Sequence, residues 1–277
     1  MTVTEPAAAS RQSANVVDFH GVTKRFGSLT VIRDVTFSVP DLHDKGEFIT
    51  ILGPSGCGKS TVLRLIAGLR PQHPPTEGTV LVGGQPVACP GPDRSMVFQD
   101  YTSFDNRTVE DNVAFGLECR GVAARERRAR AREWIAKVGL DVGRDATKYP
   151  GELSGGMRQR VAIARTLILS PRIILMDEPF GALDPTTRLH MQALLVELWK
   201  EAQATVFFVT HSIEEALYLG DRVYVFSSAP GTILREMVVP PPDRPPKEML
   251  RDSAFVERVC EIRDLMDNLT TSTRASD

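Results

Sequence analysis

The chain has 277 residues, enough for one large domain or two small ones. Apolar residues make up 42% and charged residues 25%, which are ordinary values for a globular protein with a sizeable core. The formal net charge is −2 and the isoelectric point is near 6.2, so there is no basic excess of the kind that favours a nucleic-acid partner.

Cysteine usage and the lengths of the apolar runs also narrow the class of protein. The four cysteines lack CxxC spacing, which argues against a zinc site or a disulfide framework and suits a reducing cytosol. The longest apolar runs fall far short of the roughly 20 residues needed to span a bilayer. Residues 1–15 lack a basic start followed by an apolar stretch, so we expect a flexible leader and no signal peptide.

The first predicted elements are strands. Residues 17–22 and 35–39 alternate as half-buried strands do, and 48–52 is a short apolar run. Residues 79–82 form a further strand candidate that ends at a Gly-Gly turn. Such β-rich sequence early in the chain predicts a mixed sheet, not a purely parallel one.

A glycine-rich loop of the pattern G-x-x-x-x-G-K-[ST] follows 48–52, and residues 62–67 after it have helical spacing. In this context the loop points backbone N–H groups at an anion, and the helix N-terminus adds partial positive charge. Lys59 can reach the β- and γ-phosphates of a nucleotide, and the Ser60 hydroxyl can bind Mg²⁺. The loop predicts an ATP or GTP site made of Gly53, Pro54, Ser55, Gly56, Cys57, Gly58, Lys59, Ser60 and Thr61.

Residues 109–138 have a helical pattern in which five arginines lie between positions 125 and 132. We interpret these arginines as a solvated helix face, and a functional basic patch is the alternative. The apolar run 173–176 predicts a strand buried on both faces, and it ends at Asp177 and Glu178. Asp177 can hold Mg²⁺ through water, and Glu178 can polarise an attacking water.

The remaining elements are two strand candidates, 205–209 and 223–226, with a helical segment at 212–219 between them. The proline-rich stretch 240–246 is expected to be a stiff, extended linker. Apolar residues then recur at steps of four, three and four from Phe255 to Met266, which indicates an amphipathic helix. We expect this helix to pack onto its own domain, and binding a partner is the alternative.

Several motifs together, in this order along the chain, resemble the ATPase subunit of ATP-binding cassette (ABC) transporters. Besides the phosphate loop and the two acids, they include Leu153-Ser154-Gly155-Gly156 and single residues at Gln99, Asp184 and His211. The resemblance covers roughly residues 16 to 230. It implies an α/β fold with a P-loop NTPase core and a mixed β-sheet, an antiparallel β-subdomain and an α-helical signature subdomain.

The resemblance also implies roles for individual residues. Phe26 would stack on adenine, and Gln99 would touch Mg²⁺ and link the site to a membrane partner. His211 would contact the γ-phosphate and order the catalytic site. The signature residues that would bind the ATP held by the other subunit are Ser154, Gly155 and Gly156.

A third implication is the assembly. Asp184 would lie in the loop that crosses a dimer interface, and two chains would pair head to tail around two ATP molecules. Because each chain has one phosphate loop and one signature, a complete pair of sites would require a second copy of the chain or a close relative. We expect the nucleotide-binding domain to span 16–231, with its helical subdomain at about 100–170, and the linker and terminal helix to span 232–277.

Spacing helps to choose among ABC proteins. Repair ATPases insert a long coiled coil between phosphate loop and signature, whereas here Lys59 and Ser154 are 95 positions apart. Translation factors carry two cassettes, and this chain carries one. The resulting interpretation is a cytosolic motor subunit on the inner face of the membrane, attached to separate permease subunits and served by a solute-binding protein.

Finer detail resembles the nitrate, sulfonate and taurine importer branch. Met157 and the tail Arg251-Asp252-Ser253-Ala254-Phe255-Val256 fit that branch, while 104–109 departs from its usual Phe-Pro-Trp-x-Thr-Val. Sulfonate, nitrate, taurine, bicarbonate and organic cations all stay open as the solute. A cassette ATPase that regulates a membrane complex mechanically, without cargo, is the alternative function.

Overall fold

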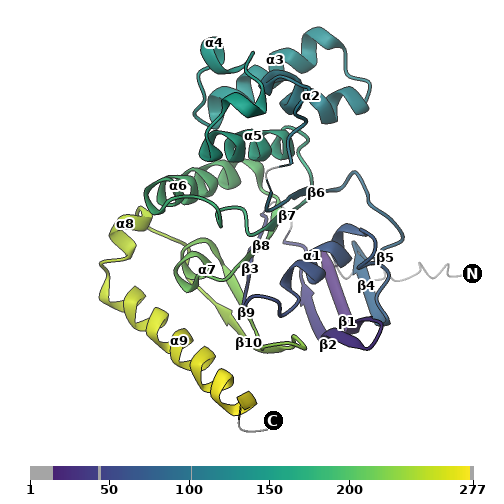
Figure 1. Ribbon diagram of the computed structural model, residues 1–277, viewed down its shortest axis with the longest axis vertical. Coiled ribbons are helices and arrows are strands. Elements are labelled where there is room, and N and C mark those ends of the chain that lie inside the picture. Colours follow the sequence, from purple (N-terminus) through teal and green to yellow (C-terminus); the bar gives the residue numbers. More distant parts are fainter. Residues whose placement is uncertain (1–14, 43–44, 101, 275–277) are drawn as a thin grey trace, which may run out of the picture.

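The computed structural model describes residues 15–42, 45–100 and 102–274, and Figure 1 shows how they are arranged. All but the last residue of the expected leader, 1–15, lie outside this part of the chain. The strands are β1 (Val17–Phe26), β2 (Leu29–Val39), β3 (Phe48–Leu52), β4 (Glu77–Val82), β5 (Gln85–Pro86), β6 (Arg94–Val97), β7 (Ile173–Asp177), β8 (Thr205–Thr210), β9 (Arg222–Phe226) and β10 (Ile233–Val238). The helices are α1 (Lys59–Ala67), α2 (Val109–Cys119), α3 (Ala124–Lys137), α4 (Val142–Asp145), the 3₁₀ turn η1 (Pro150–Glu152), α5 (Gly155–Leu167), α6 (Pro185–Ala202), α7 (Ile213–Leu219), α8 (Pro246–Met249) and α9 (Ser253–Arg274).

The central sheet has six strands in the order β10-β9-β3-β8-β7-β6. All pairs are parallel except that of β10 with β9. Every residue of β3, β7 and β8 is buried, which explains why these stretches are apolar without alternation. The parallel strands all end at one edge, which is where ligands bind in open α/β sheets.

A second, antiparallel sheet has the order β2-β1-β4-β5. Its first two strands form a hairpin that turns at Gly27, whose φ is 58°. Phe19 and Phe37 stack across this hairpin with ring centroids 4.6 Å apart. Helix α1 contacts strands of both sheets, and one hydrophobic core joins them. The predicted mixed sheet and antiparallel β-subdomain are both present.

Helices α2 to α5 form the end of the molecule opposite the antiparallel sheet (Figure 1). The single helical pattern predicted at 109–138 is in fact two helices, because the chain turns at Gly121 with a φ of 74°. Thr108 is the N-cap of α2, and its side chain accepts a hydrogen bond from the backbone N–H of Asp111. This cap and the glycine turn set both ends of α2.

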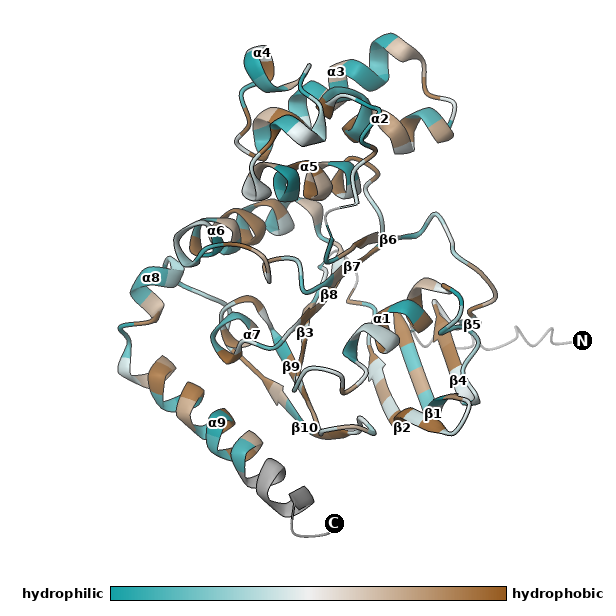
Figure 2. Cartoon of the chain, in the orientation of Figure 1, coloured by the Kyte–Doolittle hydropathy of each residue, from teal (hydrophilic) through white to brown (hydrophobic). Residues whose placement is uncertain are grey.

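The C-terminal part runs from β10 through the prolines to α8 and α9. Helix α8 contacts α6, and α9 contacts α7. Figure 2 shows brown and teal alternating along α9, and the apolar side chains of Phe255, Val259 and Ile262 are buried. This face of α9 therefore packs onto its own chain. In the described part of the chain, no helix is long and apolar enough to cross a membrane.

Candidate functional site

The glycine-rich loop connects the carboxyl end of β3 to α1, at the edge where the parallel strands end. Gly58 has a φ of 98°, and a Cβ there would lie 2.4 Å from Ile32 Cγ2 of β2. Only glycine meets both conditions, because it tolerates positive φ and has no side chain to clash. The antiparallel sheet is thus held directly against the loop.

The Lys59 side chain lies inside this loop and is almost fully buried. Its Nζ donates hydrogen bonds to the carbonyl oxygens of Gly53, at 2.9 Å, and Pro54, at 2.8 Å. It is also 3.9 Å from Glu178 Oε1. A buried ammonium group requires such acceptors, so the loop holds a positive charge where phosphate oxygens are expected.

Asp177 ends β7 and is 2% exposed. The Ser60 hydroxyl donates to its Oδ1 at 2.7 Å, and Arg64 Nη2 lies 3.8 Å from its Oδ2. Burial raises the pKa of the Asp177 carboxyl, which the Ser60 hydrogen bond and Arg64 partly oppose. A cation beside this carboxylate would therefore be favourable.

The donor set at Ser60 and Asp177 fits Mg²⁺. Among the described residues, no group of three or more His, Cys, Asp or Glu side chains is arranged to hold a metal ion. Mg²⁺ does not need such a cage, because it is typically held by one or two protein oxygens together with phosphate oxygens and water. One hydroxyl and one carboxylate next to a phosphate loop meet that requirement.

Glu178 is a non-glycine residue with a φ of 44°, a conformation that costs energy and that clusters at functional sites. Its backbone N–H donates to Val209 O at 3.1 Å. Its Oε2 lies 3.1 Å from His211 Nδ1, while its other oxygen faces Lys59. Glu178 thus contacts both His211, the residue after β8, and Lys59 of the phosphate loop.

Gln99 and Phe26 are two further predicted site residues. Gln99 is exposed two residues after β6, and the pairing of Val97 with Met176 places it at the same sheet edge as Asp177. Phe26 ends β1 and is 36% exposed, with Lys24 Nζ 5.1 Å from its ring centroid. A partly exposed aromatic ring is suited to stacking on a base.

The signature residues lie elsewhere. Ser154 is the N-cap of α5, where its hydroxyl accepts a hydrogen bond from Met157 N at 3.3 Å. Asp184 is the N-cap of α6 and accepts from the N–H groups of Thr186 and Thr187. A Cβ at Gly156 would lie 2.9 Å from Thr187 Cγ2, so the two helix starts are in contact. Across the described ranges, no hydrogen bond or ion pair joins Ser154 to the phosphate loop.

The arginines of α3 are largely paired within the chain. Arg128 and Arg132 both contact the buried carboxylate of Glu110, and Arg130 pairs with Glu126. Their side chains are more than half exposed. The stretch is therefore a solvated face whose charges mostly serve the packing of α3 on α2.

Comparison with known proteins identifies the family. The model of the ABC transporter family matches residues 32–181. The chain is also 54% identical to an uncharacterised ABC transporter ATP-binding protein of Methanocaldococcus jannaschii, over 77% of this chain and 76% of that protein. This chain is an ABC transporter ATP-binding protein.

Two further relatives are named as import ATP-binding proteins. The nitrate import ATP-binding protein NrtD of Synechocystis is 45% identical over 87% of this chain and 89% of its own length. The taurine import ATP-binding protein TauB of Rhizobium johnstonii is 52% identical over 72% and 73%. Among solved structures, the cassette MJ0796, a dimer bound to ADP and phosphate, matches with a TM-score of 0.69 and 34% identity, covering 81% of this chain and 99% of that one. The predicted ABC fold and ATPase class are confirmed.

Two residues near the site escaped the sequence analysis. Arg64 contacts Asp177, and it lies four residues after Ser60, a spacing that places both on one face of α1. Glu215 lies on an otherwise apolar side of α7. An acid among residues with helical apolar spacing was the available signal for Glu215.

Proposed function

We propose that this chain is the ATPase subunit of an importer for small anions of the nitrate, sulfonate or taurine type, acting through separate permease subunits. The names of the relatives in nitrate, taurine and aliphatic sulfonate import support the solute class. The subunit would lie peripherally on the cytoplasmic face of the membrane, and a solute-binding protein would deliver the cargo. The observation that carries the ATPase site is the continuous contact from Lys59 through Glu178 to His211.

Each residue of the cluster has a chemical task in this proposal. The Lys59 ammonium would bind the β- and γ-phosphate oxygens in place of the loop carbonyls. Glu178 would accept the proton of the attacking water, and His211 would hold that carboxylate and contact the γ-phosphate. Mg²⁺, when bound by Ser60, Gln99 and Asp177, would neutralise phosphate charge.

The functional unit would be a head-to-tail pair, because no hydrogen bond or ion pair in the described part of the chain joins the signature at Ser154, Gly155 and Gly156 to its own loop. Backbone N–H groups at the start of α5 are suited to a γ-phosphate held by the second copy. Asp184 would lie in the loop between the two chains. Within each chain we propose a nucleotide-binding domain at 16–231 and a C-terminal unit at 232–277, whose first strand, β10, pairs with β9 and completes the sheet of that domain.

Hydrolysis and pairing can be tested together on purified protein. Glu178→Gln keeps the size of the side chain and removes the basic oxygen, so ATP should still bind while turnover falls at least roughly 100-fold. The variant should accumulate as a dimer with ATP in size-exclusion chromatography, and adding Ser154→Arg should abolish that dimer. Glu257→Gln, on the exposed side of α9, is the matched control. Parental turnover in Glu178→Gln, or dimers without nucleotide, would contradict the proposal.

Transport needs its own experiment. The chain should copurify with a multi-span permease, and a solute-binding protein loaded with nitrate, taurine or an alkanesulfonate should stimulate ATP hydrolysis in proteoliposomes. The chain could instead form a stable complex with a membrane protein in which no solute stimulates ATP hydrolysis. That result would favour the alternative of a mechanical regulator without cargo.

A further inference from the structure

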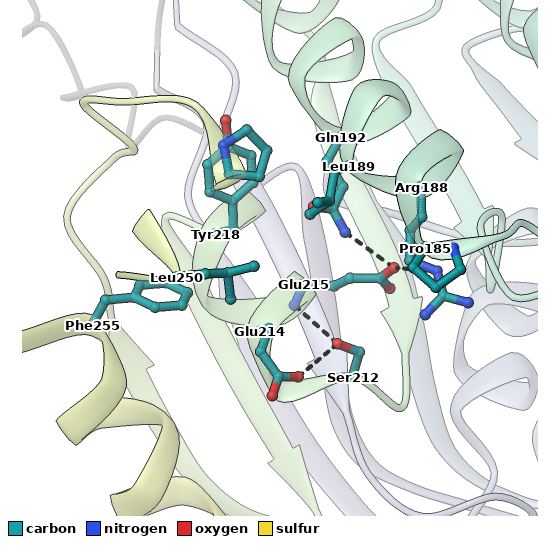
Figure 3. Close-up of a pocket in the computed structure, with 11 residues that line it drawn as sticks. Pro185, Arg188, Leu189, Gln192, Ser212, Glu214, Glu215, Tyr218, Leu250 and Phe255 are labelled. Carbon is teal, nitrogen blue, oxygen red and sulfur yellow. Dashed lines mark hydrogen bonds and ion pairs between the residues drawn. The ribbon is translucent and has the colours of Figure 1, made fainter. Parts of the chain in front are cut away.

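Glu215 is a buried acid that the proposed mechanism does not use. It lies in α7 and is 6% exposed. Its Oε2 accepts a hydrogen bond from Thr210 Oγ1 at 2.6 Å, and its Oε1 accepts one from Gln192 Nε2 at 3.2 Å. Figure 3 shows the side chain directed away from α7 toward Gln192 and Arg188 of α6.

One side of this network surrounds His211. Thr210, the residue before it, also accepts a hydrogen bond from the backbone N–H of Ser212 at 3.0 Å. Ser212, the residue after it, accepts one from the backbone N–H of Glu215 at 3.2 Å. The chain on both sides of His211 is therefore tied to Glu215 in a closed ring of hydrogen bonds.

The other side of the network leads to α6. Gln192 is 4% exposed, and Arg188 Nε lies 3.7 Å from Glu215 Oε1. Arg188 also donates through Nη2 to Leu183 O at 3.1 Å. Leu183 immediately precedes Asp184, the N-cap of α6. Glu215 thus connects the segment around His211 with the loop that precedes α6.

His211 depends on its backbone for its position. Its side chain is 51% exposed, and its imidazole Nδ1 lies 3.1 Å from Glu178 Oε2. A shift of the Thr210–Ser212 segment would move the imidazole away from Glu178. Hydrogen bonds to a carboxylate are among the stronger ones in proteins, and burial protects them from water.

From this arrangement we infer that Glu215 is a positioning residue, which fixes His211 against Glu178 and couples it to the loop 181–184. The inference rests on the proposed ATPase site. Packing alone does not explain an acid here, because the rest of α7 buries apolar residues and an acid among them costs free energy unless it is paired. The pairing is with both flanks of His211 and with α6, and with no other described element.

The first experiment compares Glu215→Gln with Glu197→Gln. An amide offers one oxygen where the carboxylate offers two, so either Thr210 or Gln192 loses its acceptor. We expect kcat for ATP to fall about 10-fold or more, as for the loss of a charge-assisted hydrogen bond, while the Kd for ATP stays within twofold. Glu197 is an exposed acid of α6 outside this hydrogen-bond network, and its variant should keep the parental kcat. Equal kcat in the two variants would overturn the inference.

The second experiment separates positioning from structural support. If Glu215 acts through His211, the double variant His211→Ala/Glu215→Gln should hydrolyse ATP no more slowly than His211→Ala alone. Independent, multiplicative losses would overturn the inference. Thr210→Val keeps the shape of the side chain and removes the hydroxyl, so it should reproduce the kcat loss of Glu215→Gln. If Glu215→Gln does not fold, Thr210→Val provides the test in its place. If the parent hydrolyses ATP and Glu178→Gln abolishes that hydrolysis, the proposed function stands. It stands even if Glu215→Gln has no effect on kcat.

Discussion

The phosphate loop and the signature are both small-residue turns at the start of a helix, yet their surroundings differ. Lys59 of the loop is buried and contacts Glu178, and Glu178 contacts His211. These three residues follow the ends of β3, β7 and β8. Ser154 of the signature is exposed, and its hydroxyl caps its own helix. Glycine geometry and a helix N-terminus alone therefore do not make a complete site.

This contrast agrees with our proposal that the ATP site is divided between two chains. The loop has charged groups in place before nucleotide arrives, as a preorganised site requires. In our proposal the signature offers backbone N–H groups to a nucleotide that the second chain holds. In our proposal hydrolysis requires both, so a change in the loop acts within one chain and a change in the signature acts across the pair.

The largest effect should come from the loop. Lys59→Ala removes the ammonium that faces the β- and γ-phosphates, so we expect no phosphate release above background and weaker ATP binding by fluorescence titration. Lys200→Ala, on the exposed face of α6, is the control and should hydrolyse ATP normally. Turnover near the parental rate in Lys59→Ala would show that the loop is not the catalytic site.

A mixture of two inactive variants should sharpen the comparison. In a dimer of a Lys59→Ala chain with a Ser154→Arg chain, one composite site has both motifs intact and the other has neither. Half of randomly formed dimers are mixed, so the mixture should recover up to about a quarter of parental phosphate release, while each variant alone stays inactive. No recovery, with dimers present by size-exclusion chromatography, would argue against sites shared between chains.

A smaller effect, on the stability of the fold, is expected in the helical part that contains the signature. Asp145 in α4 contacts Arg144 Nε at 3.0 Å and Lys148 Nζ at 2.8 Å, which hold the pKa of its carboxyl well below the usual range. A lowered pKa stabilises the fold above the unfolded-state value of about 4, and this contribution is lost as the pH falls below it.

We therefore expect Asp145→Asn to lower the Tm at pH 7, and the difference from the parent to shrink as the pH falls from about 4. Circular dichroism melts between pH 7 and 3 measure this, with Asp243→Asn in the exposed proline-rich stretch as the control. A difference in Tm that does not change with pH would contradict the assignment.

The smallest expected effect is at Cys57, within the loop. Its thiol is completely buried, and burial raises its pKa, which lowers the fraction of reactive thiolate. An adduct there would block ATP by bulk, but we expect maleimide at neutral pH to leave Cys57 unmodified and hydrolysis unchanged. Peptide mapping by mass spectrometry checks this, and labelling of Cys57 as fast as exposed cysteines would refute it.

The phosphate loop was predictable because its strand, turn and helix are contiguous in the sequence. The contact between Glu178 and His211 was not, because it depends on the pairing of Asp177 with Val209 in neighbouring strands. The resemblance to a family supplied His211, whereas the pattern around it supplied only a strand and a helix. Position within a sheet is a tertiary property that local periodicity does not contain.

Smaller errors have similar physical causes. The break between α2 and α3 was missed although Gly121 marked it, since the apolar spacing continues on both sides. Strand β10, at 233–238, was missed because its sequence does not alternate between apolar and polar residues, and most of its side chains are exposed. Glu215 was passed over because a lone acid in a helix usually faces solvent.

The exposure of the other three cysteines has a practical consequence for fluorescence experiments. Cys89, Cys119 and Cys260 are free thiols at the surface, near the antiparallel sheet, at the end of α2 and on α9. The native chain therefore carries dye-attachment points on three separate parts, while the loop thiol stays hidden. Pairs of dyes at these positions would report, by energy transfer, how the parts move during turnover without any engineered cysteine.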